Sequence, residues 1–387
     1  MTTGTTLTEA ARSAWTLADE EALLIGMLQR YTPSGAERAL SEWLCEHLRA
    51  SGLRLEVDAV GNFIAELPAT IETPEPPCVL LGHIDTVAGE IPVRREGERL
   101  YGRGAVDAKG PCAAFIAAAL RLAARGGARN RPVIIVGAVE EEAATSRGAR
   151  NVLERWHPAY TIIGEPSGAG AVTVGYKGRL LVSYRLERPG AHTARPEDSV
   201  CARAVAFWQT VQQQAEQWNA DHRATDGPAG YFAALMPSLR SIHSGSDGFQ
   251  DWCELEIGYR LPPNFDIAAH EAWLEQEARD GGALVACRGV EVAYRAPRHG
   301  PLASAFVRAM RSEGITPAFK LKTGTSDMNV VGPTWNCPIL AYGPGDSALD
   351  HTPDEHINLP EYHQATTILE RALAELVSTP AQEGVQP

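Results

Sequence analysis

The order of buried apolar segments and helices constrains the fold of this chain more than any other feature of its sequence. Apolar runs at Pro77–Leu81, Pro132–Val139 and Tyr160–Ile163 predict short buried strands, and the stretches between them have helical spacing or composition. A loop at Thr323–Asn329, a strand at Pro338–Tyr342 and a final helix from about Pro360 to Leu376 are expected to follow in the last part of the chain. Wholly apolar strands that alternate with helices are typical of a mostly parallel sheet covered on both faces. The sequence therefore predicts an α/β domain.

In the middle of the chain the predicted order becomes strand, helix, two strands, helix and strand. This β-α-β-β-α-β order is typical of a ferredoxin-like α+β arrangement. The expected elements are Arg179–Leu186, Ser199–Gln217, Phe232–Ile242, Trp252–Leu261, Ile267–Arg279 and Leu284–Tyr294.

The first order of elements resumes after Pro297. We therefore expect a discontinuous α/β domain, residues 15–176 and 296–380, interrupted by an inserted α+β domain at residues 177–295. The polar, threonine-rich residues 1–14 are expected to form a loose arm.

Composition narrows the classes of function. The chain has 35 Lys and Arg against 48 Asp and Glu, a net charge of −13, which repels nucleic acid and anionic lipid. Its seven cysteines are scattered and include no C-x-x-C pair, as in proteins of a reducing cytoplasm. No signal-peptide pattern opens the sequence, and the longest apolar stretch, around Ala113–Leu120, is shorter than a membrane span. We expect a cytoplasmic protein that binds neither nucleic acid nor membrane.

Acidic and histidine side chains follow the predicted strands or lie in the loops beyond them. They are His83 with Asp85, Asp107, Glu140–Glu142, Glu165, and Asp350 with His351. Taken singly, these residues have ordinary interpretations, such as a core histidine, a solvated acidic turn or a helix N-cap. Ligands of open α/β sheets, however, bind outside the carboxyl ends of the strands. Convergence of all five groups on one sheet edge favours a functional site.

The chemistry of these side chains favours a metal centre. Imidazoles and carboxylates without a thiolate suit Zn²⁺, Mn²⁺ or Co²⁺. Two histidines and three carboxylates exceed what one four-coordinate catalytic ion needs, whereas two ions that share a carboxylate would use all of them. Asp85 lies on the same side of an extended segment as His83 and can accept a hydrogen bond from its second ring nitrogen. One glutamate of the triplet would remain to act as a general base.

These motifs resemble those of the M20 metallopeptidases, in the same order and over about residues 20–375. The matching segments are Gly82–Thr86, Gly102–Gly110, Glu140–Glu142, Gly164–Pro166 and His351. The resemblance implies a zinc-peptidase-like catalytic domain, with the inserted domain as a lid and dimerisation domain. It also implies two divalent ions, Zn²⁺ first, with Co²⁺ or Mn²⁺ as alternatives, and a cis peptide bond between Asp107 and Ala108.

The resemblance assigns roles to residues of this chain. One ion would be held by His83, Asp107 and Glu165, and the other by Asp107, Glu142 and His351. Glu141 would be the general base and Asp85 the group that orients His83. The spacer before Gly148 is one residue longer than in the family, which leaves Glu140 and Glu141 as the alternative pair for base and ligand.

Further residues resemble the family's substrate-binding groups. His192 resembles a lid histidine that reaches the reacting carbonyl from the partner subunit of a homodimer. Arg260 resembles an arginine that binds the substrate carboxylate, and its planar fork of donors suits that group. The residues expected to line the pocket are Thr325, Ser326 and Asn329, with Asp327 or Asp346 facing a substrate ammonium.

Three segments resemble one subgroup, the carrier-protein lysine/ornithine hydrolases: Gly175–Arg179, Phe319–Asn329 and Ala341–Ser347. This resemblance implies release of lysine or ornithine from the γ-carboxyl of the C-terminal glutamate of an acidic amino-group carrier protein, in lysine and arginine biosynthesis. Because this chain is acidic too, docking would need a basic patch, for which the candidates are Lys177, Arg179, Lys320 and Lys322.

Two alternatives stay open at this point. The first is a deacylase of small N-acyl amino acids, of the acetylornithine deacetylase or succinyl-diaminopimelate desuccinylase type, or a dipeptidase. The second is a non-catalytic binding protein of the same fold. The second would lack a ligand or the base, and this sequence lacks neither.

Overall fold

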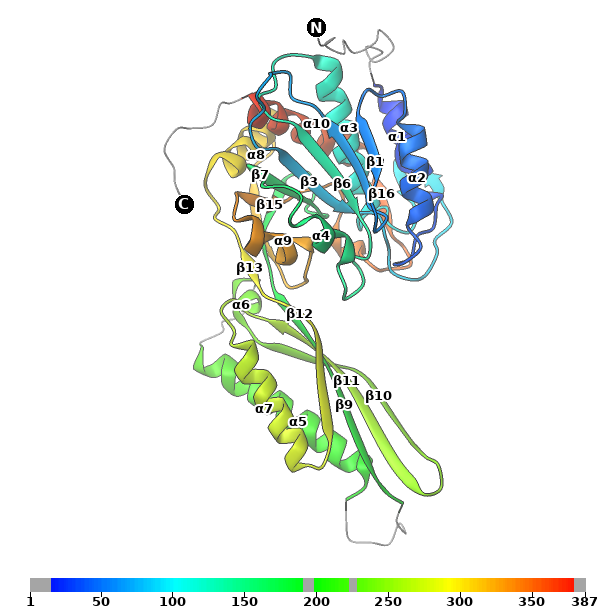
Figure 1. The fold of residues 1–387 in the computed structure, drawn as a ribbon, viewed down its shortest axis with the longest axis vertical. Coiled ribbons are helices and arrows are strands. Elements are labelled where there is room, and N and C mark those ends of the chain that lie inside the picture. The colour runs from blue at the N-terminus through cyan, green and yellow to red at the C-terminus, as the bar shows by residue number, and fades with distance from the viewer. Residues whose placement is uncertain (1–14, 191–197, 223–227, 379–387) are drawn as a thin grey trace. The chain divides into compact units, whose positions relative to one another are not determined.

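The computed structural model describes residues 15–190, 198–222 and 228–378, which form two compact units (Figure 1). The first unit takes in the chain up to Val174, then Ala296–Lys320 and the residues from Ser326 onward. The second unit comprises Gly175–Arg295 and Leu321–Thr325. It therefore begins two residues before the expected insertion and adds a short segment from the later part of the chain.

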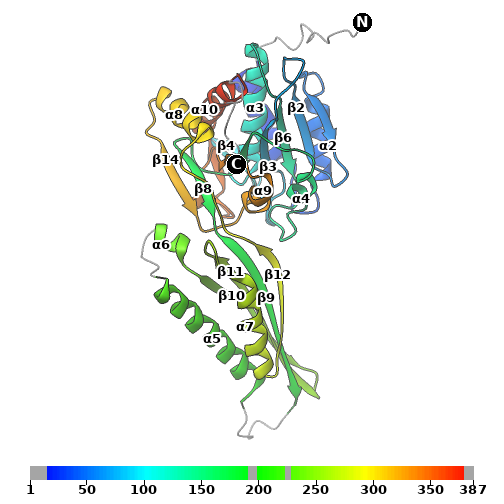
Figure 2. The ribbon, with the colours of Figure 1, turned by 60° about the vertical axis from the view of Figure 1, so that its left-hand side comes forward.

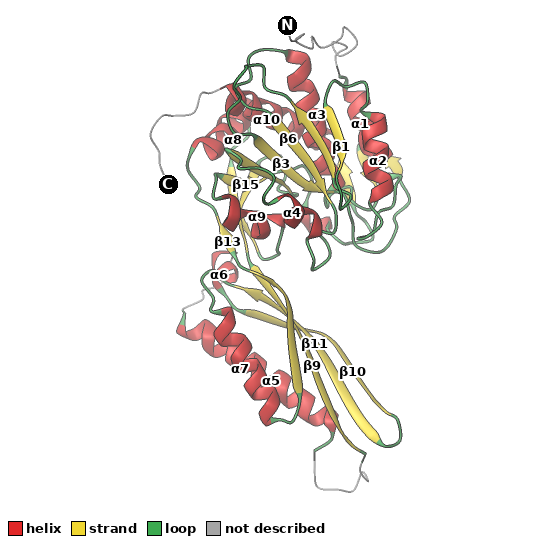
Figure 3. Ribbon diagram, viewed as in Figure 1, coloured by secondary structure: helices red, strands yellow, loops and turns green. Residues whose placement is uncertain are grey.

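The first unit is built on a large mixed sheet that is parallel at its centre (Figure 3). Seven of its strands, in spatial order, are β1 (Arg54–Val57), β2 (Phe63–Leu67), β6 (Val133–Ala138), β3 (Cys78–His83), β7 (Tyr160–Gly164), β15 (Ile339–Ala341) and β8 (Ala171–Tyr176). Strands β6, β3, β7 and β15 are parallel, and β1, β2 and β8 pair antiparallel. The central strands β3 and β6 are buried at every residue, as their apolar sequences predict. The expected fold class is confirmed.

Helices cover both faces of this sheet (Figure 2). On one face α3 (Lys109–Arg125) packs on the central strands and is surrounded by α1 (Leu17–Leu28), α8 (Pro301–Ser312) and α10 (Leu359–Ser378). On the other face lie α4 (Arg147–Val152) and α9 (Asp327–Trp335), while α2 (Arg38–His47) packs on β1 and β2. The many alanines of α3 allow it to lie close to the sheet, because short side chains leave room for a neighbour. None of the helices in the described ranges is both long and apolar enough to cross a membrane.

One expectation for this unit is wrong. The segment from Thr323 to Asn329 was expected to be a loop, but α9 already begins at Asp327. Ser326 and Asn329 form a capping box, in which each side chain binds a backbone group of the first turn. The cap satisfies N–H groups that a helix start leaves free, and so it fixes the start of α9 here.

A small second sheet joins two distant segments of the chain. It consists of β4 (Arg94–Glu96), β5 (Arg99–Tyr101) and β16 (His356–Asn358). Leu100 of β5 lies opposite Ile357 of β16 in an antiparallel pair. The chain just before Asp107 is thereby held beside the chain just after His351.

The second unit has an antiparallel four-stranded sheet. Its strands are β9 (Gly178–Pro189), β10 (Met236–Ser246), β11 (Gln250–Leu261) and β12 (Leu284–Glu291), in the order β10-β11-β9-β12. Helices α5 (Val200–Asp221) and α7 (Ile267–Asp280) pack against the apolar residues that alternate along these strands. This is the expected β-α-β-β-α-β order. The short strands β13 (Tyr294–Arg295) and β14 (Ala318–Lys322) belong to the large sheet, where both pair with β8.

The second expected strand of this unit starts later than predicted. It was expected from Phe232, but β10 begins at Met236 and a short helix, α6 (Pro228–Ala233), precedes it. The ammonium of Lys177 donates hydrogen bonds to the carbonyl groups of Tyr231, Phe232 and Ala234 at the end of α6. A buried cation at the carboxyl end of a helix satisfies carbonyl groups that would otherwise lack partners.

Candidate metal centre

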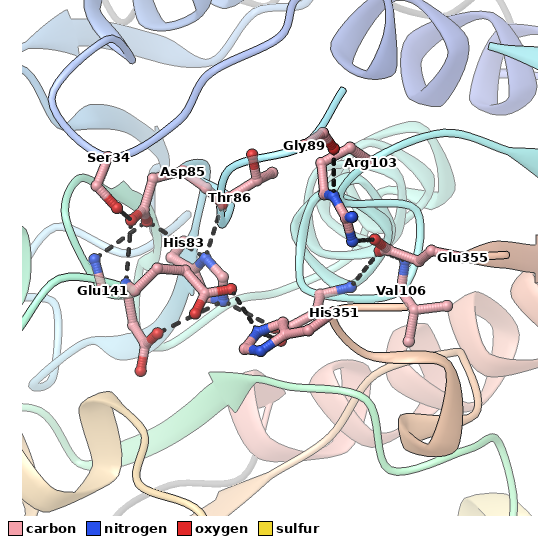
Figure 4. A network of polar contacts seen from close by, with 12 residues as sticks. Ser34, His83, Asp85, Thr86, Gly89, Arg103, Val106, Glu141, His351 and Glu355 are labelled. Atoms are coloured by element: carbon pink, nitrogen blue, oxygen red, sulfur yellow. Dashed lines mark hydrogen bonds and ion pairs between the residues drawn. The ribbon is translucent and has the colours of Figure 1, made fainter. Parts of the chain in front are cut away.

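The acidic and histidine side chains of the first unit meet at one edge of its large sheet (Figure 4). His83 is the last residue of β3, Glu140–Glu142 follow β6, and Glu165 follows β7. The chain beyond β15 passes a short 3₁₀ turn, Ser347–Leu349, and reaches His351. Because β3, β6, β7 and β15 are parallel, their carboxyl ends lie at the same edge.

Asp107 lies between the two histidines. One of its carboxylate oxygens, Oδ1, is 3.1 Å from Nε2 of His83, and the other, Oδ2, is 3.1 Å from Nε2 of His351. His351 Nε2 is also 3.0 Å from Oε1 of Glu142. The peptide bond between Asp107 and Ala108 is cis, as the resemblance implies. A carboxylate with one oxygen toward each histidine has the geometry of a bridging ligand.

Two further glutamates complete the cluster. Carboxylate oxygens of Glu141 and of Glu165 each lie 3.9 Å from Nε2 of His83. Among the described residues, the ligand atoms of two overlapping triplets lie within 4.8 Å of one another; the triplets are His83, Asp107 and Glu142, and His83, Glu141 and Glu165. Glu141 therefore lies where a carboxylate could either bind an ion or take a proton from a nearby water.

Glu140 points elsewhere. Its carboxylate pairs with Arg147 at 3.0 Å and accepts a hydrogen bond from the hydroxyl of Thr145. Its backbone has a positive φ of 57°, which turns the chain between β6 and the following residues. Of the two glutamates that the sequence left as alternatives for the base, the structure brings Glu141 into the cluster.

Asp85 fixes several parts of the site at once. Nδ1 of His83 donates to the backbone oxygen of Asp85 at 3.1 Å and is 3.3 Å from its carboxylate. The two carboxylate oxygens accept the backbone N–H groups of Glu141 and Glu142, each at 3.0 Å. Ser34 donates to the same carboxylate at 2.7 Å. A partner on Nδ1 leaves Nε2 facing the cluster in the form that a metal requires.

Two residues that support Asp85 and the Glu140–Glu142 segment were not predicted from the sequence. Ser34 binds Asp85, and Glu37 accepts the backbone N–H of Glu140 at 3.1 Å. Both lie in the turn after α1, about fifty to a hundred positions from their partners in the sequence. Pro33, Ser34 and Gly35 are typical turn residues, but no local pattern of residue types shows that this turn lies beside the metal centre.

The electrostatics of the cluster show a deficit of positive charge. Burial raises the pKa of Glu141 well above its usual value, and the charges of Glu165 and Asp327 raise it further. Burial likewise raises the pKa of Glu142. These carboxylates are costly to ionise together in a buried place unless a cation joins them.

The histidines supply positive charge when no metal is bound. Hydrogen bonds to Asp107 and Glu142 raise the pKa of His351 to about 10. Burial would lower the pKa of His83, but its contacts with Asp107 and Asp85 prevail and raise it well above the usual value. Divalent ions would take the place of these protons, so the donor set fits a metal centre of oxygen and nitrogen ligands.

The predicted substrate-binding residues belong partly to the second unit and partly to the first. In the second unit, the guanidinium of Arg260 donates to the hydroxyl of Thr325 at 3.1 Å. In the first unit, Ser326 and Asn329 are buried in the cap of α9, and Asp327 is close enough to raise the pKa of Glu141. Their roles toward a substrate stay predictions.

Other predicted residues have different outcomes. His192 lies outside the described residues. Asp346 accepts the backbone N–H of Ala348 and caps the 3₁₀ turn. Lys177, proposed for a docking patch, is wrong in that role, because its side chain is fully buried on the carbonyl groups at the end of α6.

Comparisons with known proteins agree with this geometry. A profile described as peptidase family M20/M25/M40 matches residues 79–375. The chain is 41% identical over 349 residues to a [LysW]-lysine hydrolase from Deinococcus radiodurans, covering 89% of this chain and 93% of the relative. It is 37% identical over 350 residues to a putative [LysW]-lysine/[LysW]-ornithine hydrolase from Thermococcus kodakarensis, covering 90% of each. The fold matches a metallo-carboxypeptidase of family M20 from Sulfolobus solfataricus, with a TM-score of 0.75, 16% identity, and coverage of 92% and 99%.

Proposed function

Because the chain belongs to peptidase family M20/M25/M40 and is a metal-dependent amidohydrolase, we propose that it releases lysine or ornithine from an amino-group carrier protein. The bond cleaved is the amide between the amino acid and the γ-carboxyl of the carrier's C-terminal glutamate. The observation that carries this proposal is similarity over about nine-tenths of the chain to relatives named for [LysW]-lysine and [LysW]-ornithine. The reaction belongs to lysine biosynthesis and, with ornithine, to arginine biosynthesis. A cytoplasmic location stays a prediction from the sequence.

Two divalent ions would occupy the centre, and Zn²⁺ suits its nitrogen and oxygen donors, with Co²⁺ or Mn²⁺ as alternatives. His83, Asp107 and Glu165 would hold one ion, and Asp107, Glu142 and His351 the other. The position of Asp107 between the two histidines supports this division. When bound, such ions act as Lewis acids that polarise a carbonyl group and make a water molecule more acidic.

The residues of the chain then carry the protons. Glu141 takes a proton from the attacking water and later returns it to the nitrogen of the departing amine. The position of its carboxylate supports this role, because it lies within the cluster and 3.9 Å from Nε2 of His83. Asp85 keeps His83 in one tautomer and holds the backbone of Glu141, so that the base stays in place.

Side chains of the chain would also hold the substrate. Arg260, which is hydrogen-bonded to Thr325, would bind the substrate carboxylate, and Thr325, Ser326 and Asn329 would line the pocket. His192 would come from the partner subunit of a homodimer and face the developing negative charge of the carbonyl oxygen. The carrier is an acidic protein, and Arg179, Lys320 and Lys322 remain as candidates to meet it.

A deacylase of small N-acyl amino acids or a dipeptidase would use the same metal centre. These activities differ from the proposed one in the acyl group that the enzyme accepts. An assay with competing substrates therefore separates them, whereas any property of the metal centre alone would not.

The test is release of free amino acid from the Zn²⁺-loaded enzyme, measured by mass spectrometry. The substrates are γ-glutamyl-lysine and γ-glutamyl-ornithine conjugates on a carrier protein, with N-acetylornithine and a dipeptide beside them. We expect lysine or ornithine to be freed from the carrier, and the Glu141→Gln variant to lose this activity. Turnover of N-acetylornithine or the dipeptide alone would overturn the carrier assignment.

A further inference from the structure

Glu355 binds the loop that presents Asp107 to the metal centre, and Figure 4 shows its carboxylate against Arg103 and the backbone of Val106. Its side chain is 1% exposed. Oxygen Oε1 accepts two backbone N–H groups, that of Val106 at 2.9 Å and that of Asp107 at 3.2 Å. The carboxylate therefore fixes the backbone of Asp107 itself.

Arg103 holds the other side of this carboxylate. Its Nη1 donates to Oε2 of Glu355 at 2.8 Å, and its Nε donates to the backbone oxygen of Gly89 at 2.8 Å. Arg103 is nearly buried, so this is an ion pair largely shielded from water. Both oxygens of Glu355 are thus engaged, and the carboxylate has little freedom to leave the N–H groups.

The same residue connects the two loops that flank the second predicted ion. Glu355 follows His351 by four residues, and its backbone oxygen accepts the N–H of Gly102 at 3.3 Å. The next residue, His356, begins β16, which pairs with β5 just before the Asp107 loop. A shift of Glu355 would therefore move Asp107 relative to His351, which its Oδ2 now approaches within 3.1 Å.

We propose that Glu355 is a positioning residue, which holds Asp107 in the orientation that allows it to bridge two metal ions. The inference rests on the two-ion centre of the proposed function. Glu355 touches neither ion nor substrate in this scheme; it acts through the backbone of Asp107. Residues behind metal ligands commonly change metal affinity 10- to 100-fold when they are replaced.

The experiment measures binding of Co²⁺ to the metal-free full-length chain by calorimetry and by the visible absorption of the second equivalent. Glu355→Met removes both acceptor oxygens at similar volume, and Glu355→Gln keeps one oxygen for the two N–H groups. Arg103→Met removes the partner and leaves the carboxylate. Glu20→Gln is the matched control, because Glu20 also pairs with an arginine inside the first unit but contacts no residue of the centre.

We expect Glu355→Met to lower the affinity for the second equivalent of Co²⁺ by about 10- to 100-fold and to change the absorption spectrum of that bound ion. Glu355→Gln should lie between this variant and the wild type. Glu20→Gln should lower the unfolding temperature while its Co²⁺ affinity stays at the wild-type value. If Glu355→Met does not fold, Arg103→Met is expected to lower the affinity for the second equivalent of Co²⁺ by a smaller factor.

The outcomes separate this inference from the function on which it rests. A wild-type chain that binds fewer than two ions contradicts the two-ion centre. A wild-type chain that binds two ions, with unchanged affinity and spectrum in Glu355→Met, overturns the positioning role. Where only Arg103→Met can be measured, wild-type affinity in that variant overturns it as well. Equal loss of Co²⁺ affinity in the Glu20→Gln control would show that general destabilisation explains the effect.

Discussion

The first unit contains two clusters of charged side chains that differ in their charge balance. In the metal centre, four carboxylates surround two histidines, and the pKa of Glu141 and of Glu142 is raised. In the second cluster, both carboxylate oxygens of Glu20 accept hydrogen bonds from the guanidinium of Arg121. Nδ1 of His363 lies 3.1 Å from Oε2 of the same carboxylate. Burial would raise the pKa of Glu20, but these contacts prevail and lower it.

The difference shows how a structural cluster can be told from one that binds a cation. Where α1, α3 and α10 meet, Arg121 and His363 offset the charge of Glu20 within the protein. At the sheet edge, the carboxylates exceed the cations that the chain supplies, so bound metal ions would complete the balance. Replacing an acid should therefore have opposite consequences for stability in the two places.

The largest effect is expected for Glu141→Gln, which should lower turnover by about 10²- to 10⁴-fold, the usual contribution of a general base. The metal-free variant should be at least as stable as the wild type, since it removes an acid from a cluster that already holds too many. Steady-state kinetics and thermal unfolding in the presence of a chelator measure the two quantities. A large loss of stability in the metal-free variant would contradict the proposed charge imbalance.

In the balanced cluster, formed by Glu20, Arg121 and His363, removal of an acid should lower stability and leave turnover unchanged. Glu20→Ala leaves Arg121 and His363 without their buried partner and should lower the free energy of unfolding by about 3 kcal/mol. The value is at the lower end for a buried pair, because Arg121 still contacts Thr367 and Glu370 and is partly exposed, and His363 still lies 3.2 Å from Glu21. Turnover of the folded variant should stay near the wild-type value. Chemical denaturation followed by fluorescence gives the first number, and a tenfold loss of turnover would argue against independence of the two clusters.

Metal binding should stabilise one cluster and not the other. Zn²⁺ at about 100 times its dissociation constant should add about 2.7 kcal/mol to the free energy of unfolding. His83→Ala should lose most of this gain, while Glu20→Ala should keep it. Thermal unfolding at several Zn²⁺ concentrations is the measurement, and an equal gain in wild type and His83→Ala would place the metal elsewhere.

The smallest expected effect is a pH dependence of the balanced cluster. The hydrogen bond with Glu20 raises the pKa of His363 above its usual 6.5, so the folded chain favours the protonated form. The resulting stability is fully present below about pH 6.5 and is lost as the pH rises through the raised pKa. The difference in unfolding free energy between the metal-loaded wild type and His363→Asn should therefore shrink with increasing pH. A difference that grows with pH would reverse this assignment.

Much of the centre could be predicted from the sequence because its signals are local. His83 ends an apolar strand and Glu140–Glu142 follow another, so their place at the sheet edge follows from the parallel order of the strands. Ser34, Glu37 and Glu355 could not be found in this way. Ser34 donates a hydrogen bond to a loop far away in the sequence, and Glu37 and Glu355 accept hydrogen bonds from such loops. No spacing of residue types indicates contacts of this kind.

The sequence by itself determined the α/β architecture, the inserted β-α-β-β-α-β order and the sheet edge at which the ligands meet, because burial and periodicity are properties of short segments. The tertiary structure decided which way the side chains in the loops point. It turned Glu140 toward Arg147 and Glu141 toward His83, and it buried Lys177 on the end of α6. Side-chain direction in a loop depends on partners that only folding brings together, and for that reason it could not be read from the neighbouring residues.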